Sequence, residues 1–334
     1  MKKNMFTILT LILFVSNIFA QPKFVEMNTK PGAFSRMGFG ARGIGMGNAM
    51  SSVTTGNLVS YYNPALAPFQ QNNSIQTSYS FLSLDRSLNF ISFTRKFDFY
   101  SSLDTAADRQ PRGTAGISAG LINSGVSAID GRDNNGIKTE ELSTSENQFF
   151  LSVSNRFSRK LSIGIAVKFY YYKLYEEVTS NGFGLDIGAL YKLNDNWNIS
   201  LMLSDLNSKY QWDTSPVYDQ SGLSTTDEFP LLKKIGVSYF NPELRILTAL
   251  EFENSNAGTN IIRAGIEYNI YEGLFLRGGI DQFNLSNIDA AFKPSIGFSY
   301  SKAFDSWIIG IDYAFMIEQY SSSDRHIIGV NFNF

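Results

Sequence analysis

The sequence predicts an all-β fold, a transmembrane antiparallel β-barrel of about 14 strands. Three observations support this prediction. Apolar residues alternate with small or polar ones in many short segments, no stretch beyond residue 20 has the pattern of a membrane-spanning helix, and the connections alternate between short and long. Because lipid cannot hydrogen-bond free backbone groups, a membrane protein without such helices has to close its strands into a barrel.

The composition excludes several other classes of protein. The chain has 334 residues and no Cys, which excludes disulfide scaffolds, thiolate catalysis and Cys-bound metal centres. Its 28 basic and 30 acidic residues give a net charge of -2, which provides no basic surface for nucleic acid. Only 17% of the residues are charged, against about 25% in soluble domains. We therefore expect a membrane protein with no nucleic-acid partner.

The first 20 residues have the pattern of a cleaved secretory signal peptide. Lys2 and Lys3 precede an apolar run from Met5 to Val15, and Ala20 is a small residue at the expected cleavage site. An uncleaved anchor helix is the alternative, but the run is far shorter than the ~20 residues that a membrane span needs. We therefore expect a protein that is exported to the outer membrane, where it contacts lipid and lipopolysaccharide.

The alternation has a period of two, which is typical of β-strands. In the segment 162–171, for example, Ile163 and Ile165 alternate with Gly164 and Ala166. A soluble sandwich also alternates, but its outward face is usually rich in Lys and Glu. Here the second face carries Gly, Ser, Ala and isolated charges, which favours a narrow and partly filled barrel lumen.

Fourteen segments follow this pattern and place the barrel at residues 73–334. The number is even, as in bacterial outer-membrane barrels. The last segment ends on Phe334, and a terminal Phe on an alternating strand resembles the assembly signal of such barrels. The predicted strands are 73–82, 88–97, 114–122, 147–157, 161–174, 182–192, 197–205, 232–240, 245–253, 260–269, 273–280, 293–301, 306–315 and 326–334.

The connections test the barrel independently, because bacterial barrels have short periplasmic turns and longer outside loops. With a periplasmic N-terminus, the connections 123–146, 206–231 and 316–325 fall on the outer face, and all three are long. The connections expected in the periplasm are mostly tight, as at 158–160. The link 98–113 does not follow this alternation.

Residues 21–72 do not alternate and form a separate segment before the barrel. The glycine-rich run 40–50 and the run 61–65 resemble the N-terminal signature of the PorV/PorQ family, within the FadL-like outer-membrane barrels. The strand at 182–191, in which glycines flank an aspartate, resembles a further motif of that family. The chain differs at 54–57, where relatives often carry an acidic stretch.

The resemblance implies a fourteen-stranded barrel whose segment 21–72 folds into the lumen as a hatch. It also implies a non-catalytic role in type IX protein secretion or surface attachment, with secreted proteins or other secretion components as partners. FadL-like relatives instead pass hydrophobic small molecules, which is the alternative function. The hatch motif of the family falls on Ala41, Arg42, Gly45, Gly47, Asn48, Ala49, Asn63, Pro64 and Ala65.

Five charged residues lie on the small or polar face of their strands, so the alternation directs them into the lumen. Because unpaired buried charge is costly, we expect them to pair with one another or with Arg42 of the hatch. The functional alternative is a polar pathway, or a gate that opens when the hatch moves. These lumen charges are Asp186, Arg263, Glu267, Arg277 and Asp312.

An enzymatic function has weaker support. Ser118 lies in a G-x-S-x-G pattern and His326 is the only histidine. Because a related family member has been named as a lipopolysaccharide deacylase, lipid hydrolysis remains a minor alternative. The glycines around Ser118 are, however, the alternate small residues of a predicted strand, and no helix follows them. Catalysis would require Ser118 and His326 within hydrogen-bond reach of each other.

Two further patterns do not support a bound group. The glycines of 38–43 match a dinucleotide-binding fingerprint but lack the strand before it and the helix after it. The loop that starts at Asp130 has the length of a calcium loop, but it carries Arg132 in place of an oxygen ligand and Asn135 in place of the turn glycine. We therefore expect neither a metal nor a cofactor.

The aromatic residues gather near the outer end of the predicted barrel. Tyrosines 170–172 and Tyr175 are expected in a girdle at the membrane boundary. Tyr210 and Trp212 lie in a long outer loop, where exposed aromatic side chains often contact a partner protein.

Overall fold

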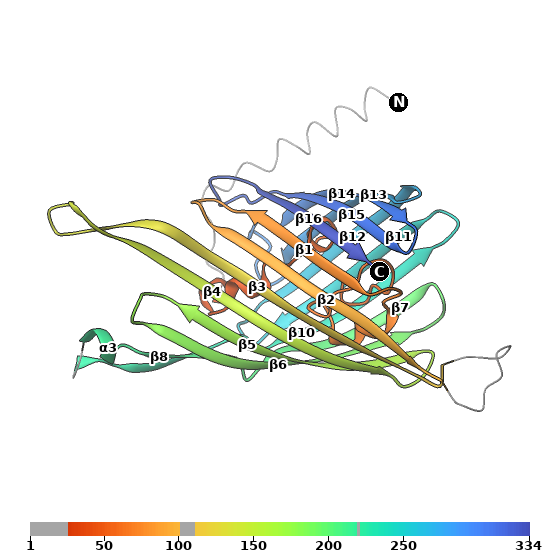
Figure 1. Cartoon of the computed structure of the whole chain (residues 1–334), viewed down its shortest axis with the longest axis horizontal. Helices are drawn as coiled ribbons and strands as arrows, with labels where there is room; N and C mark the ends of the chain where they lie inside the picture. The colour runs from red at the N-terminus through yellow and green to blue at the C-terminus, as the bar shows by residue number, and fades with distance from the viewer. Residues whose placement is uncertain (1–25, 101–110, 219–220) are drawn as a thin grey trace, which may run out of the picture.

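The chain forms a closed barrel of fourteen antiparallel strands, which confirms the predicted fold class (Figure 1). The structure is a computed structural model that describes residues 26–100, 111–218 and 221–334. Each barrel strand pairs with the barrel strand before it and the one after it, and β1 (Ser74–Phe81) pairs with β16 (Arg325–Asn333) to close the wall.

Each of the fourteen predicted segments corresponds to one strand of the barrel. The agreement follows from the strict inside and outside alternation that a closed wall between lipid and lumen imposes. Between β1 and β16, the barrel strands are β2 (Ser87–Phe99), β3 (Gly113–Arg132), β4 (Lys138–Arg156), β5 (Leu161–Lys173), β6 (Thr179–Lys192), β7 (Trp197–Leu206), β10 (Leu232–Asn241), β11 (Ile246–Ser255), β12 (Asn260–Tyr271), β13 (Leu274–Asn284), β14 (Lys293–Phe304) and β15 (Trp307–Met316).

The two ends of the barrel differ in the length of their connections. Short turns, such as 157–160 and 305–306, lie at one end, which we assign to the periplasm because bacterial barrels have short turns there. The opposite, outer end carries the long hairpins. The link 98–113, which breaks the predicted alternation, joins strands at the periplasmic end, and its central residues 101–110 lie outside the described part of the chain.

The largest difference from the prediction is the length of β3 and β4. Most of the segment 123–146, predicted as an outer loop, is strand, because the pairing continues as far as Arg132 and Lys138. Beyond the barrel neither face of this hairpin meets lipid, so its side chains need no apolar alternation, and periodicity does not detect it. Figure 1 shows the hairpin projecting well past the other strands of the barrel.

The connection 206–231 also contains a hairpin. It consists of β8 (Lys209–Asp213) and β9 (Ser224–Glu228), joined in part by the short helix α3 (Ser215–Tyr218). β8 packs along β6. β8 and β9 therefore form a second, two-stranded sheet over one side of the outer barrel mouth.

The barrel wall has an apolar outer face and a polar or small inner face. In β5, Ile163, Ile165 and Val167 are exposed on the outer face, whereas Ala166 and Lys168 are buried inside. The exposed apolar side chains suit contact with lipid, and the inner ones suit contact with a lumen filled by protein.

Residues 26–72, coloured red to orange in Figure 1, lie inside the barrel, and we refer to them as the hatch. The helix α2 packs against β13 to β16, whereas η4 packs against β2 to β6. The hatch therefore bridges opposite sides of the lumen. Its short helices are η2 (Glu26–Thr29), η3 (Ala33–Arg36), α2 (Ala41–Gly45) and η4 (Pro64–Phe69).

None of the described helices is long and apolar enough to cross a membrane. The signal peptide predicted at residues 1–20 lies outside the described part of the chain.

Candidate functional site

The hatch touches the barrel wall through backbone contacts at glycines that face the lumen. A Cβ atom at Gly164 of β5 would lie 2.5 Å from the Pro64 backbone, and one at Gly116 of β3 would lie 2.6 Å from the Ala67 backbone. Carbon atoms do not approach so closely, so only glycine fits at these positions. Hatch atoms also approach lumen-facing glycines on five other strands, at Gly188, Gly236, Gly265, Gly279 and Gly297.

Asn63 and the two residues after it organise the side of the hatch that faces β5 and β6. The Asn63 side chain accepts a hydrogen bond from the Ala65 amide at 2.9 Å and so caps η4. Its amide also donates to the backbone oxygen of Ser51 at 2.9 Å and to that of Ala189 at 3.3 Å. Pro64 occupies the first turn of η4, where no N–H is needed. These contacts hold the helix against the wall.

The opposite side of the hatch docks through α2 and the turn that follows it. Ala41 is buried against the wall, and the Gly45 backbone packs against β14. Gly47 and Asn48 have φ angles of 58° and 61°, which reverse the chain inside the lumen. The Asn48 amide then donates to the Asp281 carboxylate at 2.8 Å.

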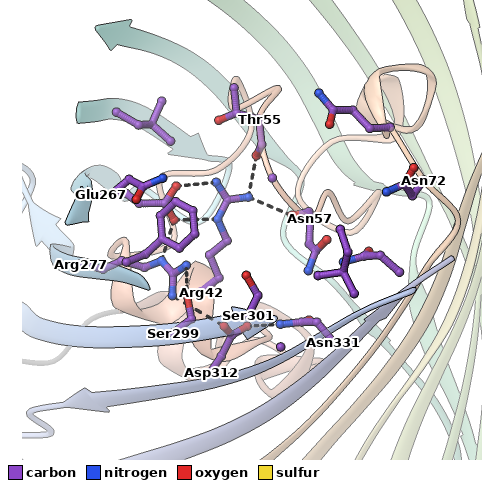
Figure 2. A pocket seen from close by; sticks show the side chains of 18 of the residues that line it. Arg42, Thr55, Asn57, Asn72, Glu267, Arg277, Ser299, Ser301, Asp312 and Asn331 are labelled. Carbon is purple, nitrogen blue, oxygen red and sulfur yellow. Dashed lines mark hydrogen bonds and ion pairs between the residues drawn. The ribbon is translucent and has the colours of Figure 1, made fainter. Parts of the chain in front are cut away.

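Arg42 makes the central ionic contact between hatch and wall (Figure 2). Its Nε and Nη2 donate to the two carboxylate oxygens of Glu267 at 2.9 and 2.8 Å. Its Nη1 donates to the backbone oxygens of Thr55 and Asn57 at 2.7 and 2.9 Å. Arg277 of β13 places its Nε 2.6 Å from Glu267 Oε2. One buried carboxylate therefore joins an arginine of the hatch to an arginine of the wall.

Arg263 is the centre of a second buried ionic group. Its Nε lies 2.7 Å from Asp281 Oδ1, and its Nη1 lies 3.3 Å from Glu251 Oε1 and 3.1 Å from Glu253 Oε2. The three carboxylates are not among the predicted lumen charges. Glu251 and Glu253 alternate on the inner face of a predicted strand, so the same periodicity could have found them. Asp281 lies just beyond the predicted end of its strand.

Asp186 belongs to a third group, on the other side of the lumen. Lys168 Nζ lies 2.7 Å from Asp186 Oδ2 and 3.0 Å from Asp205 Oδ1. Asp205 has a φ angle of 62° at an irregularity in the pairing of β6 with β7, and its amide donates to Asp186 at 2.9 Å. Strict alternation does not anticipate a bulge, so the sequence does not identify Asp205 as a lumen residue.

Asp312 and Arg325 complete the charged contacts of β15 and β16. Asp312 accepts a hydrogen bond from Asn331. Arg325 is almost fully buried and donates to the Met37 backbone oxygen at 2.8 Å and to Ser80 Oγ at 3.0 Å. It lies one residue before the predicted start of the last strand, which is why the sequence prediction does not include it.

The rest of the hatch packs into an apolar cluster that we call the apolar seam. Phe39 stacks on Phe90 of β2 with ring centroids 5.3 Å apart, and Ala49 of the hatch motif is buried in the same cluster. The lumen therefore has a mainly ionic side along β10 to β16 and, apart from the group around Lys168 and Asp186, a mainly apolar side along β2 to β6. The seam includes Phe34, Phe39, Met50, Leu58 and Leu66 of the hatch and Leu88, Phe90, Ile122, Phe150, Tyr170 and Leu190 of the wall.

The hatch separates two chambers. The outer chamber has a volume of about 570 Å³ and is lined by Arg36, Arg86 and Lys293, among others. The periplasmic chamber has a volume of about 460 Å³ and contains the Arg42 and Glu267 pair (Figure 2). Two cavities between them, within the hatch layer, measure only about 20 Å³ each. A cavity of that size holds about one water molecule, so passage requires the hatch contacts to part.

The outer face of the wall is hollowed at one position beside the apolar seam. A groove of about 420 Å³ on the outer face is lined by Tyr79, Ile91 and Ile328, with Thr77 and Phe90 at its base. Thr77 and Phe90 also line one of the small cavities inside the hatch layer. The groove and the internal cavity therefore face each other across the same two residues.

Ser118 and His326 do not form a catalytic pair. Ser118 is fully buried on the inner face, where its Oγ lies 2.9 Å from the Thr94 hydroxyl. His326 is exposed on the outer face and its Nδ1 lies 2.7 Å from the Tyr313 hydroxyl. The two side chains therefore lie on opposite faces of the wall. Among the described residues, no group of three His, Asp or Glu side chains is arranged to hold a metal ion.

Two expectations about aromatic residues are wrong. Tyr170 is not in a lipid-facing girdle but is fully buried in the lumen, because its position in β5 alternates with Tyr171. Tyr210 is not exposed on an outer loop, since β8 turns it toward Tyr172 and leaves only 2% of its surface accessible. The ring centroids of Trp212 and Tyr210 lie 5.6 Å apart. These rings form an aromatic cluster at the outer end of the apolar seam.

The fold resembles that of known outer-membrane transporters. One structure of the Pseudomonas putida toluene transporter TodX aligns with a TM-score of 0.57 and 17% identity, over 88% of this chain and 96% of TodX. A second TodX structure gives a TM-score of 0.54 and 15% identity, over 89% of this chain and 99% of TodX. The barrel is of the outer-membrane type. At these identities the likeness extends to the fold alone.

A Pseudomonas aeruginosa FadL homologue also aligns, with a TM-score of 0.49 and 10% identity, over 87% of this chain and 97% of that one. Neither a protein-family model nor a curated protein matches the sequence.

Proposed function

We propose that this barrel is a channel that admits small hydrophobic molecules through the outer membrane. The observation that carries the proposal is the apolar seam between the hatch and β2 to β6. Hydrophobic molecules move favourably from water onto apolar surface, so the seam offers them a path beside the hatch. Porins for polar solutes instead have a polar interior. The fold shared with the toluene transporter TodX is consistent with such a channel.

The proposed entrance is the aromatic cluster at the outer end of the seam. Tyr170 and Phe229 lie with ring centroids 4.7 Å apart, and Tyr210 lies 4.9 Å from Phe229. Aromatic rings provide large apolar faces, so a hydrophobic molecule can rest against them before it moves inward.

The proposed exit is sideways into the bilayer, at Thr77 and Phe90. A hydrophobic molecule that leaves there enters lipid directly and avoids the charged periplasmic chamber, where it would be less favourable. β1 and β2 are paired along their shared length, so the exit requires these two strands to part locally. The groove outside Thr77 marks a place on the outer face that side chains leave unfilled.

The experiment is to express the protein in a bacterial strain that lacks its own channel for hydrophobic molecules and to measure uptake of labelled toluene. We expect uptake to rise on expression and to fall severalfold with Thr77→Trp, because the indole fills the groove. The matched control is Thr248→Trp, which places the same side chain on the outer face of β11, away from the groove. Equal uptake by Thr77→Trp and the wild type would exclude this exit, and no uptake on expression would exclude the function.

A second candidate is a PorV/PorQ-like role in type IX secretion or in surface attachment of secreted proteins, from the resemblance of the hatch motif. The projecting β3 and β4 hairpin favours it, since exposed residues such as Asp133 and Ile137 offer a recognition surface outside the membrane. Deletion of the gene followed by fractionation of the culture distinguishes the two functions. Retention of normally secreted proteins supports secretion, whereas normal secretion with reduced toluene uptake supports the channel.

A further inference from the structure

We propose that the periplasmic chamber is a binding site for a small hydroxylated carboxylic acid, of the acidic-sugar class, that enters from the periplasm. The chamber volume of about 460 Å³ lies within the ~300–1,000 Å³ that is usual for ligand pockets. Its lining includes the exposed Arg245, in the turn between β10 and β11, and the buried Asn333, near the end of β16. Both belong to the periplasmic end of the barrel.

Three polar atoms of chamber residues have no hydrogen-bond partner. They are Arg277 Nη1, Asn269 Oδ1 and Asn333 Oδ1, which come from β13, β12 and β16. Buried polar groups are nearly always paired with protein, water or a ligand, so these three atoms can take a partner from a molecule in the chamber when their side chains turn toward it. The terminal torsion of an Asn side chain is soft, which allows both carbonyls to turn toward a ligand. These three atoms offer a ligand one N–H donor, from the Arg277 guanidinium, and two carbonyl acceptors, from Asn269 and Asn333.

The charges around the chamber favour an anion. Three arginines, Arg42, Arg245 and Arg277, face two carboxylates, Glu267 and Asp312. Arg42 already uses four of its five N–H donors in hydrogen bonds within the protein. Arg277 Nη1 lies 3.9 Å from Asp312 Oδ1, too far for a hydrogen bond. A ligand carboxylate would therefore find donors at Arg277 and Arg245, and arginine is well suited to carboxylates.

The uncharged residues of the chamber lining indicate which groups the ligand carries besides its carboxylate. Phe240 and Phe275 are among the lining residues, and the Arg277 guanidinium lies 5.8 Å from the Phe275 ring centroid. A sugar ring has C–H groups that pack on an aromatic face and hydroxyl groups that donate to Asn carbonyls. A hydrophobic acid would leave the Asn269 and Asn333 carbonyls unpaired, so a hydroxylated acid fits better.

This site is distinct from the proposed path for hydrophobic molecules. The chamber lies on the ionic side of the lumen, around β10 to β16, and neither Thr77 nor Phe90 is among its lining residues. The ligand would bind beside Arg42 of the hatch without passing through the barrel. Loss of toluene uptake and loss of acid binding are therefore separate outcomes.

The test is binding of D-glucuronate to the purified full-length protein in detergent, measured by isothermal titration calorimetry. D-glucose, which lacks the carboxylate, and benzoate, which lacks the hydroxyl groups, serve as comparison ligands. We expect glucuronate to bind at least about tenfold more tightly than either, since a hydrogen bond to a charged group is worth roughly 1.5–3 kcal/mol. Equal affinity for all three, or no binding of glucuronate, would overturn the proposal.

Two variants locate the binding without disturbing the buried ion pairs. Arg245→Gln, at an exposed lining residue, and Asn269→Leu, inside the chamber, should each weaken glucuronate binding about tenfold. The matched control is Arg95→Gln, which removes the same charge from the outer face of β2 and should bind as the wild type does. Unchanged binding by both chamber variants would place the ligand elsewhere and refute the site.

Discussion

Arg42 and Glu267 lie 225 residues apart in the sequence and form a two-point ion pair in the middle of the lumen. Both side chains are almost fully buried. Because Arg277 of the wall shares the same carboxylate, the pair ties the hatch to the barrel on its ionic side. The apolar side has no ion pair of this kind and is joined to the hatch by packing and by neutral hydrogen bonds, such as that from Ser162 to the Ala65 backbone oxygen, so we expect it to part more readily.

Arg42→Met should destabilise the protein strongly. The substitution leaves Glu267 with only one of its two arginine partners and leaves the Thr55 and Asn57 carbonyls without a donor. Loss of a buried pair partner typically costs about 3–5 kcal/mol of unfolding free energy. Urea unfolding in detergent micelles measures the change. Lys96→Met, which breaks a more exposed pair with Asp98, should cost no more than about 1 kcal/mol, and equal losses would contradict this account.

Gly164→Ala should loosen the hatch, whereas Gly113→Ala should not. The added methyl at Gly164 would lie 2.5 Å from the Pro64 backbone, while one at Gly113 meets no atom within 4 Å. Overpacking of this kind costs about 1–3 kcal/mol. We expect the ion conductance of Gly164→Ala in planar bilayers to exceed that of the wild type. Identical conductance in both variants would mean that the contact does not seal the lumen.

Phe39→Ala should lower stability and raise transport together. The change removes the ring that stacks on Phe90 and opens a cavity in the apolar seam, at a typical cost of about 3–5 kcal/mol. If hydrophobic molecules use the seam, toluene uptake per folded barrel should rise. Phe99→Ala, on an exposed side chain, is the control for general loss of aromatic surface. Reduced uptake per folded barrel in Phe39→Ala would argue against the seam as the path.

The tip of the β3 and β4 hairpin should loosen in acid. Hydrogen bonds from Lys138 and Arg132 hold the pKa of Asp130 below its usual value. A lowered carboxylate pKa gives stability that is present above the unfolded value, near 3.9, and is lost as the pH falls through the folded value. The protection factor of the amide protons at the hairpin tip, which compares their hydrogen exchange with that of an unfolded chain at the same pH, should therefore fall below about pH 4 in the wild type. Asp130→Asn should lose this pH dependence, while Glu140→Gln should keep it.

Ser118→Ala and His326→Ala should leave lipid chemistry unchanged. The two side chains lie on opposite faces of the wall, so they cannot exchange a proton during hydrolysis. Mass spectrometry of the lipid A released from cells that express each variant measures its acylation. Loss of an acyl-chain trimming activity in either variant would revive the deacylase alternative.

The barrel was predictable because it depends on an alternation between residues that are neighbours in the sequence. Each strand separates lipid from lumen, so Ile163 and Gly164 must face opposite ways wherever the chain crosses the membrane. The inner positions of Glu267 and Arg277 follow from the same rule, and both are buried in the lumen. The rule fails where the wall is irregular or ends, as at Asp205 in its bulge and in the part of β3 beyond the barrel.

The amino-acid order by itself determined the number of strands, their faces and the presence of a non-alternating segment before them, because these depend on neighbours two residues apart. Only the tertiary structure decided which charges meet, since Arg42 finds Glu267 when the hatch is folded inside a closed wall. It also decided that Tyr210 is buried, because β8 folds back over the barrel mouth. Long-range pairing depends on how the elements pack, and no period in the sequence encodes it.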